Sequence, residues 1–279
     1  MSDPRPLQAS LKPRASPPGR RAPSPAGAVR ALAAGRVARA VLVAALVVGG
    51  WQAVVLVAAP PPYILPGPGR VAAALVGNAR FLAENALVTT LEIGLGLVLG
   101  VGLGVATAVA MAIAPAARRL LLPGIVVVQS LPVFALAPLL VLWLGFGLAS
   151  KVVMASLVIF FPVASALNDG LGRTDPALLD LARLAGASRG TTLAIIRFPA
   201  ALPDLVSGLR VAAAIAPIGA VIGEWVGAAA GLGFVMLHAN ARMQTDLMFA
   251  ALAVLAVIAV ALRAAIDRLG RRLVPWVEG

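Results

Sequence analysis

The chain has 279 residues, of which 61% are hydrophobic and only 12% are charged, with 23 Lys and Arg against 11 Asp and Glu. A soluble domain is roughly 45–50% apolar and about 25% charged, so this composition excludes a water-soluble fold and indicates an integral membrane protein. The absence of cysteine excludes disulfide frameworks and thiolate chemistry, and a single histidine, His238, excludes a multi-histidine metal site. We expect neither a metal site nor catalytic residues.

Residues 1–36 are rich in Pro, Arg, Ser and Gly and contain few large apolar side chains. They do not fit a signal peptide, because the first apolar run begins near Val37 and is too long for an h-region. The composition is typical of a disordered, basic cytoplasmic tail. A nucleic-acid-binding patch is the alternative, but the tail has no aromatic residue that could stack on a base.

Residues 37–276 are predicted to form one transmembrane domain. Six apolar runs lie near the length that spans about 30 Å of hydrocarbon, and they cover 37–59, 86–113, 121–144, 150–168, 208–227 and 246–266. We therefore predict an all-α membrane protein with about six transmembrane helices. Small residues on a common helix face allow close packing in lipid, and the second run carries them at Gly94, Gly96, Gly100, Gly102 and Gly104.

The basic residues predict the orientation of these spans. Of the 23 Lys and Arg, only Arg70, Arg80, Lys151 and Arg242 fall on one side of the predicted membrane. The others lie in the tail, near Arg118, in 169–210 and at the C-terminal end. Because cytoplasmic segments carry the excess of Lys and Arg, both termini are predicted to be cytoplasmic in a multi-pass bacterial inner-membrane protein.

Residues 169–207 form the one long loop, and their pattern predicts short helices. Asp175 precedes Pro176 as a helix cap, Gly186 stops the first helix, and Ser188 caps a second one that ends before Pro199. The loop has two interpretations, a structured connector or a docking element for a soluble partner. In the second, three arginines would point outward, namely Arg183, Arg189 and Arg197.

The string Asp180-Leu181-Ala182, then Gly186, then Ile196-Arg197-Phe198-Pro199, resembles the EAA loop of bacterial ABC-importer permeases. The family pattern has Glu, Ala and Leu where this chain has Asp180, Leu181 and Phe198. Over roughly 37–276 the chain is similar to binding-protein-dependent transport inner-membrane components of the type I importer kind. The resemblance implies that the loop 169–207 couples to an ATPase through Asp180, Ala182, Arg183, Gly186, Ile196 and Pro199.

Further strings resemble the nitrate/sulfonate/taurine branch of these permeases. They include Ile64-Leu65-Pro66-Gly67-Pro68 and Gly223-Glu224-Trp225-Val226-Gly227. The stretch 239–246 resembles permeases linked to a hydroxymethylpyrimidine-like thiamine precursor. These resemblances imply a translocation path for a small solute of one of the two kinds.

No stretch matches the P-loop pattern G-x-x-x-x-G-K-[ST], so we expect ATP to be bound by a partner subunit and no cofactor in this chain. The resemblance implies three partners: a cytoplasmic ATPase, a periplasmic or lipid-anchored substrate-binding protein, and a second permease copy, most simply a homodimer. Membrane lipid surrounds the spans, and no nucleic-acid partner is expected.

Two carboxylates fall inside apolar runs, Glu92 and Glu224. Charged groups in lipid usually face the bundle or water. We predict Glu224, with Trp225, as candidates for the translocation path or gate, against the alternative that Glu224 is satisfied structurally, and we interpret Glu92 as structural. A secondary transporter is the main functional alternative, although neither repeat symmetry nor mid-membrane ionisable groups favour it.

Overall fold

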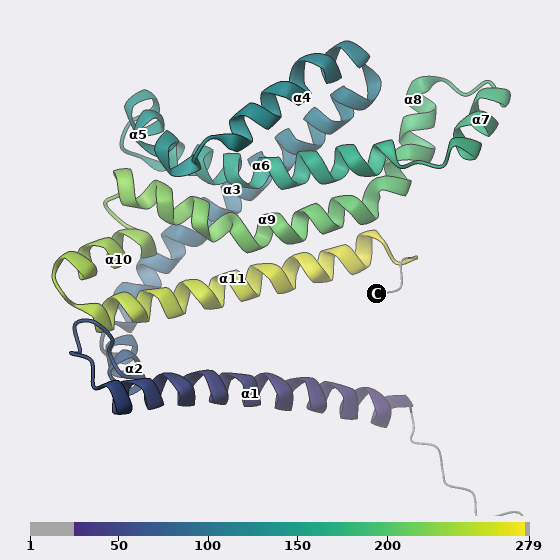
Figure 1. Ribbon diagram of the computed structural model, residues 1–279. Helices are drawn as coiled ribbons and strands as arrows, with labels where there is room; N and C mark the ends of the chain where they lie inside the picture. The colour runs from purple at the N-terminus through teal and green to yellow at the C-terminus, as the bar shows by residue number, and fades with distance from the viewer. Residues whose placement is uncertain (1–24, 277–279) are drawn as a thin grey trace, which may run out of the picture. The chain divides into compact units, whose positions relative to one another are not determined.

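The computed structural model describes residues 25–276, and every regular element in that range is a helix (Figure 1). The helices are α1 Pro25–Ala58, α2 Pro68–Gly77, α3 Ala79–Ile113, α4 Pro115–Ser130, α5 Val133–Leu144, α6 Leu148–Gly172, α7 Pro176–Leu184, α8 Arg189–Thr192, η1 Leu193–Arg197, α9 Phe198–Gly227, α10 Leu232–Ala241 and α11 Thr245–Leu273. The predicted all-α class is confirmed.

The chain divides into two compact units, residues 1–54 and 55–279. The first contains most of α1, which begins at Pro25. Residues 25–36 of the tail that we predicted to be disordered are therefore helical, and the part of the tail before Pro25 lies outside the described residues. Residues 41–58 of this helix are long and apolar enough to cross a membrane.

The centre of the second unit is α6, which packs along α3 and α9. Glycines permit the close approach of α3, as the sequence predicted for part of the stripe. A Cβ on Gly96 would lie 2.6 Å from the Ala155 Cβ of α6, and a Cβ on Gly100 would lie 2.7 Å from the Ser156 carbonyl oxygen. Gly94 and Gly102 have no such neighbour within 4 Å, so only one face of the stripe is used for packing.

Five helices of the described range are long and apolar enough to cross a membrane, where the sequence predicted about six. The difference lies in residues 121–144, which form parts of α4 and α5 instead of one continuous helix. Pro132 causes the break, because proline has no amide hydrogen and disfavours helical backbone in the residue before it. At the end of α4, the hydroxyl of Ser130 donates to the Val127 carbonyl oxygen at 2.7 Å.

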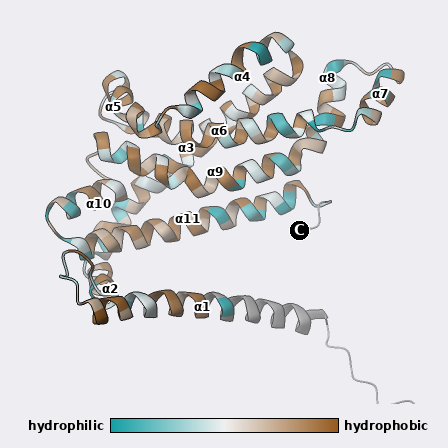
Figure 2. Cartoon of the chain, in the orientation of Figure 1, coloured by the Kyte–Doolittle hydropathy of each residue, from teal (hydrophilic) through white to brown (hydrophobic). Residues whose placement is uncertain are grey.

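Hydropathy follows this arrangement (Figure 2). Hydrophobic residues dominate α9 and the first part of α11, whereas hydrophilic residues gather around α8 and toward the C-terminal end of α11. The buried core between α3, α6 and α9 is almost wholly aliphatic, with Ile159, Val163 and Leu167 of α6 at 0% exposure. Polar side chains buried within this second unit therefore require a specific explanation.

Candidate functional site: a coupling element, a buried polar network and a cavity

The loop between α6 and α9 forms the predicted helix–glycine–helix element. Asp175 caps α7 by accepting a hydrogen bond from the Ala177 amide at 2.9 Å, with Pro176 as the first helical residue. Gly186 adopts φ +72, a left-handed conformation that favours glycine, and so turns the chain after α7. Ser188 caps α8 through the Thr191 amide at 3.1 Å. All three of these local predictions are confirmed.

The predicted coupling residues lie in different environments of this element. Asp180 is exposed and pairs with Arg183 at 2.8 Å, so that both polar groups are on the surface of α7. Ala182 is buried. Ile196 and Pro199 are half-buried in η1 and at the start of α9. Three leucines of α7 are exposed as well: Leu178 is 45% exposed, Leu181 is 63% exposed and Leu184 is 87% exposed.

The expectation that three arginines point outward is wrong for Arg197. Its guanidinium is half-buried and donates to the Leu171 carbonyl oxygen from Nη2 at 2.8 Å and from Nε at 3.2 Å. Nη1 donates to the Ala112 carbonyl oxygen at 3.4 Å. The side chain thus joins the end of the loop to the ends of α3 and α6, while Arg183 and Arg189 remain exposed.

The prediction that the second short helix ends before Pro199 is wrong, because the helical backbone continues through that residue. This short helix is followed by a π-helical turn, η1, and the chain continues into α9 through Pro199 and Pro203. Pro199 has no amide hydrogen for the Ile195 carbonyl, and the Phe198 amide instead bonds to the Leu193 carbonyl five residues back. The helix–glycine–helix element is therefore continuous with α9, and the combined helix is long and apolar enough to cross a membrane.

Glu224 lies in a buried polar network, with 1% of its surface exposed. It accepts a hydrogen bond from the Thr89 hydroxyl of α3 at 2.6 Å and another from the Gly233 amide at the start of α10. The Leu232 amide donates to the Thr89 oxygen at 2.8 Å. Asn85 completes the contact by accepting from the Gly231 amide at 2.8 Å. Glu224 thus satisfies the N-terminus of α10, where amide groups lack helical partners.

A buried ion pair lies close to this network. The Lys151 ammonium of α6 is 3.2 Å from Glu92 Oε1 of α3, and both side chains are nearly inaccessible. Lys151, which was predicted to lie on the side of the membrane opposite the cytoplasm, is buried near the start of α6. Trp225, the neighbour of Glu224, instead faces away from the network and is 52% exposed. The two candidate path residues are therefore not brought together.

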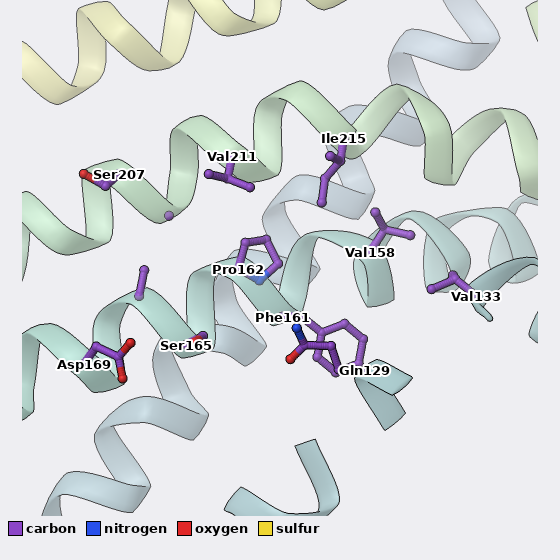
Figure 3. A pocket seen from close by; sticks show the side chains of 12 residues that line it. Gln129, Val133, Val158, Phe161, Pro162, Ser165, Asp169, Ser207, Val211 and Ile215 are labelled. Atoms are coloured by element: carbon purple, nitrogen blue, oxygen red, sulfur yellow. The ribbon is translucent and has the colours of Figure 1, made fainter. Parts of the chain in front are cut away.

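A cavity of about 560 Å³ lies between α6, α9 and the break that separates α4 from α5 (Figure 3). Its walls are mainly apolar, with Val158 and Phe161 from α6 and Val211 from α9. Four polar side chains also line it, and they are Gln129, Ser165, Asp169 and Ser207. Gln129 and Val133 enter the lining from the two sides of the Pro132 break, so the break shapes the cavity.

A helical membrane bundle that combines such a cavity with a rigid helical element at one end has the architecture of a solute-transport permease. Residues 97–279 match the family described as binding-protein-dependent transport system inner membrane component, and the chain belongs to this family. It is a permease subunit of an ABC transporter for small solutes. In this family, ATP hydrolysis takes place in a separate ATPase subunit, and a substrate-binding protein supplies the solute.

Three relatives support the assignment. A probable ABC transporter permease protein of Haemophilus influenzae is 47% identical over 86% of this chain and 98% of that protein. The formylaminopyrimidine transport permease protein ThiX of Halalkalibacterium halodurans is 34% identical over 77% of this chain and 86% of its own length. The riboflavin transport system permease protein RibX of Chloroflexus aurantiacus is 39% identical over 81% of this chain and 85% of its own length.

A solved structure agrees at the level of the fold. The inward facing MetNI methionine ABC transporter contains a chain that superimposes with a TM-score of 0.56, covering 70% of this chain and 95% of that one at 21% identity. The chain is thus a multi-pass inner-membrane protein with the fold of an ABC permease.

Sequence reasoning missed Arg197 as an anchor, the Lys151–Glu92 pair, and Asn85 and Thr89 as partners of the α10 N-terminus. Asn85 and Thr89 are separated from their partners by more than a hundred positions, 146 for Asn85 and 135 for Thr89 with Glu224. One signal was available: Asn85, Thr89 and Glu92 recur at helical spacing in a largely apolar stretch, which indicates one polar face on a buried helix.

Proposed function

We propose that two copies of this chain form the path by which a small organic solute enters the cell, with an ATPase docked at α7 and α8. The observation that carries the proposal is the built geometry of the coupling element. Caps at Asp175 and Ser188 and the turn at Gly186 give the element one defined shape. Arg197 ties the same element to the ends of α3 and α6.

This geometry supports a rigid-body mechanism. The element continues through η1 into α9, and α9 packs along α6 beside the cavity. A displacement of α7 and α8 by a closing ATPase is then transmitted to the walls of the cavity without an intervening flexible hinge. Reorientation of these walls alternates access to the solute between the two sides of the membrane. In the proposed orientation, both termini and α7–α8 are cytoplasmic.

The names of the relatives support two kinds of solute. The relatives ThiX and RibX, which match most of the chain, are named for a formylaminopyrimidine and for riboflavin. The taurine permease TauC of Escherichia coli is 36% identical over 58% of this chain. The proposal therefore covers pyrimidine-like heterocycles and taurine- or sulfonate-like solutes, delivered by an external binding protein.

The test is reconstitution of the permease in liposomes with its ATPase and binding protein. We expect uptake of at least one labelled solute from the set aminopyrimidine, riboflavin and taurine, requiring internal ATP and a hydrolysis-competent ATPase. Uptake that needs only an ion gradient and no ATPase would establish secondary transport and contradict the proposal.

A pair of exposed apolar residues tests the docking surface. Leu184 on α7 is 87% exposed. If the ATPase docks on α7, Leu184→Ser should reduce co-purification of the ATPase, because the replacement removes an apolar contact from the interface. Val76 on α2 is 80% exposed and gives the matched control, Val76→Ser, which should leave co-purification unchanged. Equal behaviour of the two variants would place the ATPase elsewhere.

A further inference from the structure

The cavity beside α6 and α9 contains one charged side chain, Asp169, and its charge is not neutralised within the described part of the chain. The carboxylate is exposed, and no Lys or Arg among residues 25–276 pairs with it. Its Oδ1 accepts a hydrogen bond from the Asn168 side-chain amide at 3.5 Å. The nearby cation Arg173 is paired with Asp204 at 3.4 Å, and neither residue lines the cavity.

The other polar groups of the cavity are also available to a solute. Gln129 and Ser165 are exposed and make no side-chain hydrogen bond within the described range, whereas the Ser207 hydroxyl donates to the Pro203 carbonyl oxygen at 3.1 Å. Pro162 lies in the lining as well and, having no amide hydrogen, leaves the Val158 carbonyl without its usual helical donor. The cavity therefore offers two groups that only accept hydrogen bonds, the Asp169 carboxylate and a backbone carbonyl, beside an amide and hydroxyls that can donate or accept.

The position of the cavity favours a solute in transit as the occupant. Irregular backbone inside a membrane protein is tolerated where it lines a cavity, and the Pro132 break between α4 and α5 lines this one. Asp169 and Ser207 lie toward one end of the cavity and Val133 toward the other (Figure 3). The volume of about 560 Å³ is within the range of sites for small organic ligands.

Pairing of two copies strengthens the electrostatic argument. In a twofold-symmetric dimer, each copy presents the same residues to a shared path. A second copy would therefore add a second Asp169 and no cation from the corresponding lining. An anion that has shed its water would meet two carboxylates of the same sign, whereas an amine or ammonium group would gain charge-assisted hydrogen bonds.

We propose that this cavity is a transit site for small uncharged or cationic solutes with N–H donors, and that Asp169 selects them against anions such as sulfonates and nitrate. The inference rests on the proposed function, because it names the solute class of that same path. Between the two solute kinds supported by the relatives, it favours amino-substituted nitrogen heterocycles.

Direct binding to the purified permease–ATPase complex, without the binding protein, tests the proposal. The two probes are 4-amino-5-hydroxymethyl-2-methylpyrimidine and butanesulfonate, measured by isothermal titration calorimetry. We expect measurable binding of the aminopyrimidine and none of butanesulfonate. Asp169→Asn should weaken aminopyrimidine binding about tenfold or more, as expected for the loss of one charge-assisted hydrogen bond, and Asp169→Glu should retain it.

Two further variants make the test specific to charge in the cavity. Asp169→Lys should abolish aminopyrimidine binding and permit binding of butanesulfonate. Glu84→Gln is the matched control, since Glu84 is an exposed carboxylate of α3 that pairs with Arg80 outside the cavity lining. It should bind the aminopyrimidine as the unaltered protein does.

Uptake by the complete complex in liposomes distinguishes a failure of the proposed solute class from a failure of the proposed permease function. ATP-dependent uptake of butanesulfonate that is unchanged in Asp169→Asn would overturn the solute class while the permease function stands. Failure of the aminopyrimidine to bind the complex would overturn it as well. Absence of ATP-dependent uptake of every solute, in a complex that contains all subunits, would overturn the permease function itself and the inference with it.

Discussion

The guanidinium of Arg197 donates two hydrogen bonds to one backbone oxygen, that of Leu171, at 2.8 and 3.2 Å. Leu171 lies at the end of α6 and Arg197 at the end of η1, so the two-pronged contact closes the loop that contains α7 and α8. A planar guanidinium can make both bonds at once, whereas an ammonium cannot reproduce that geometry. The element that is proposed to receive the ATPase is therefore anchored at its base by one side chain.

Arg197→Lys should preserve the charge and weaken this anchor. We expect a loss of about 1 kcal/mol in the free energy of unfolding and a reduced rate of ATP-dependent uptake, because the loop is less firmly joined to α6. Thermal unfolding of the detergent-solubilised permease measures the first effect. Arg189→Lys is the control, since Arg189 is exposed and forms no ion pair within the described residues. Equal melting temperatures for the two variants would show that the Leu171 contact is dispensable.

Gly186 should be sensitive to side chains that disfavour its left-handed backbone. Its φ is +72 and a Cβ would meet no atom within 4 Å, so any effect arises from the backbone and not from crowding. Gly186→Val should cost on the order of 1–2 kcal/mol locally and reduce association with the ATPase, while the spans still insert. Gly186→Asn should be milder, because asparagine tolerates this conformation. Normal co-purification and normal uptake in Gly186→Val would refute the coupling role.

Replacement of Glu224 distinguishes a role of this residue in the gate from a role in packing. Glu224→Gln keeps the shape but replaces one acceptor oxygen with a donor, so it cannot accept from both Thr89 and Gly233. We expect the start of α10 to lose about 1–3 kcal/mol, with melting temperature and uptake falling together. Thr89→Val should give a similar loss, and the double variant should cost less than the sum. Reduced uptake at an unchanged melting temperature would instead support a direct role of Glu224 in the gate.

The proposed orientation can be measured because the chain has no cysteine. Ser188 and Asn240 are both exposed, so a single cysteine at either position is accessible to a reagent on its own side of the membrane. In intact cells, Ser188→Cys should resist an impermeant external maleimide and Asn240→Cys should react. Both should react once the membrane is permeabilised. Labelling of Ser188→Cys but not Asn240→Cys in intact cells would reverse the topology.

The sequence predicted those features whose causes are local. The caps of α7 and α8 and the turn at Gly186 each depend on residues within a few positions of one another. Hydropathy likewise located the apolar segments, but it averages over Pro132 and so merged parts of α4 and α5 into one span. The contacts of Arg197 with Ala112, and of Asn85 with Gly231, join residues far apart in the chain. No local pattern specifies which distant partner such a side chain meets.

The glycines of α3 provide a prediction with an internal control. A Cβ on Gly100 would lie 2.7 Å from the Ser156 carbonyl oxygen and 2.9 Å from the Ile159 Cβ, both on α6. A Cβ on Gly102, two residues along the same helix, would have no neighbour within 4 Å. Gly100→Ala must therefore push α3 away from α6, and we expect a loss of about 1–3 kcal/mol in stability.

Gly102→Ala should be neutral or stabilising by up to about 1 kcal/mol, because alanine is the better helix former and meets no obstruction. Thermal unfolding of the two purified variants measures the difference between them. The comparison cancels the general effect of Gly→Ala on helix propensity and leaves the packing cost at the α3–α6 contact. Equal melting temperatures would mean that α3 and α6 are not packed through this face of the glycine stripe. A lower melting temperature for Gly100→Ala alone would confirm that the close approach of the two helices depends on it.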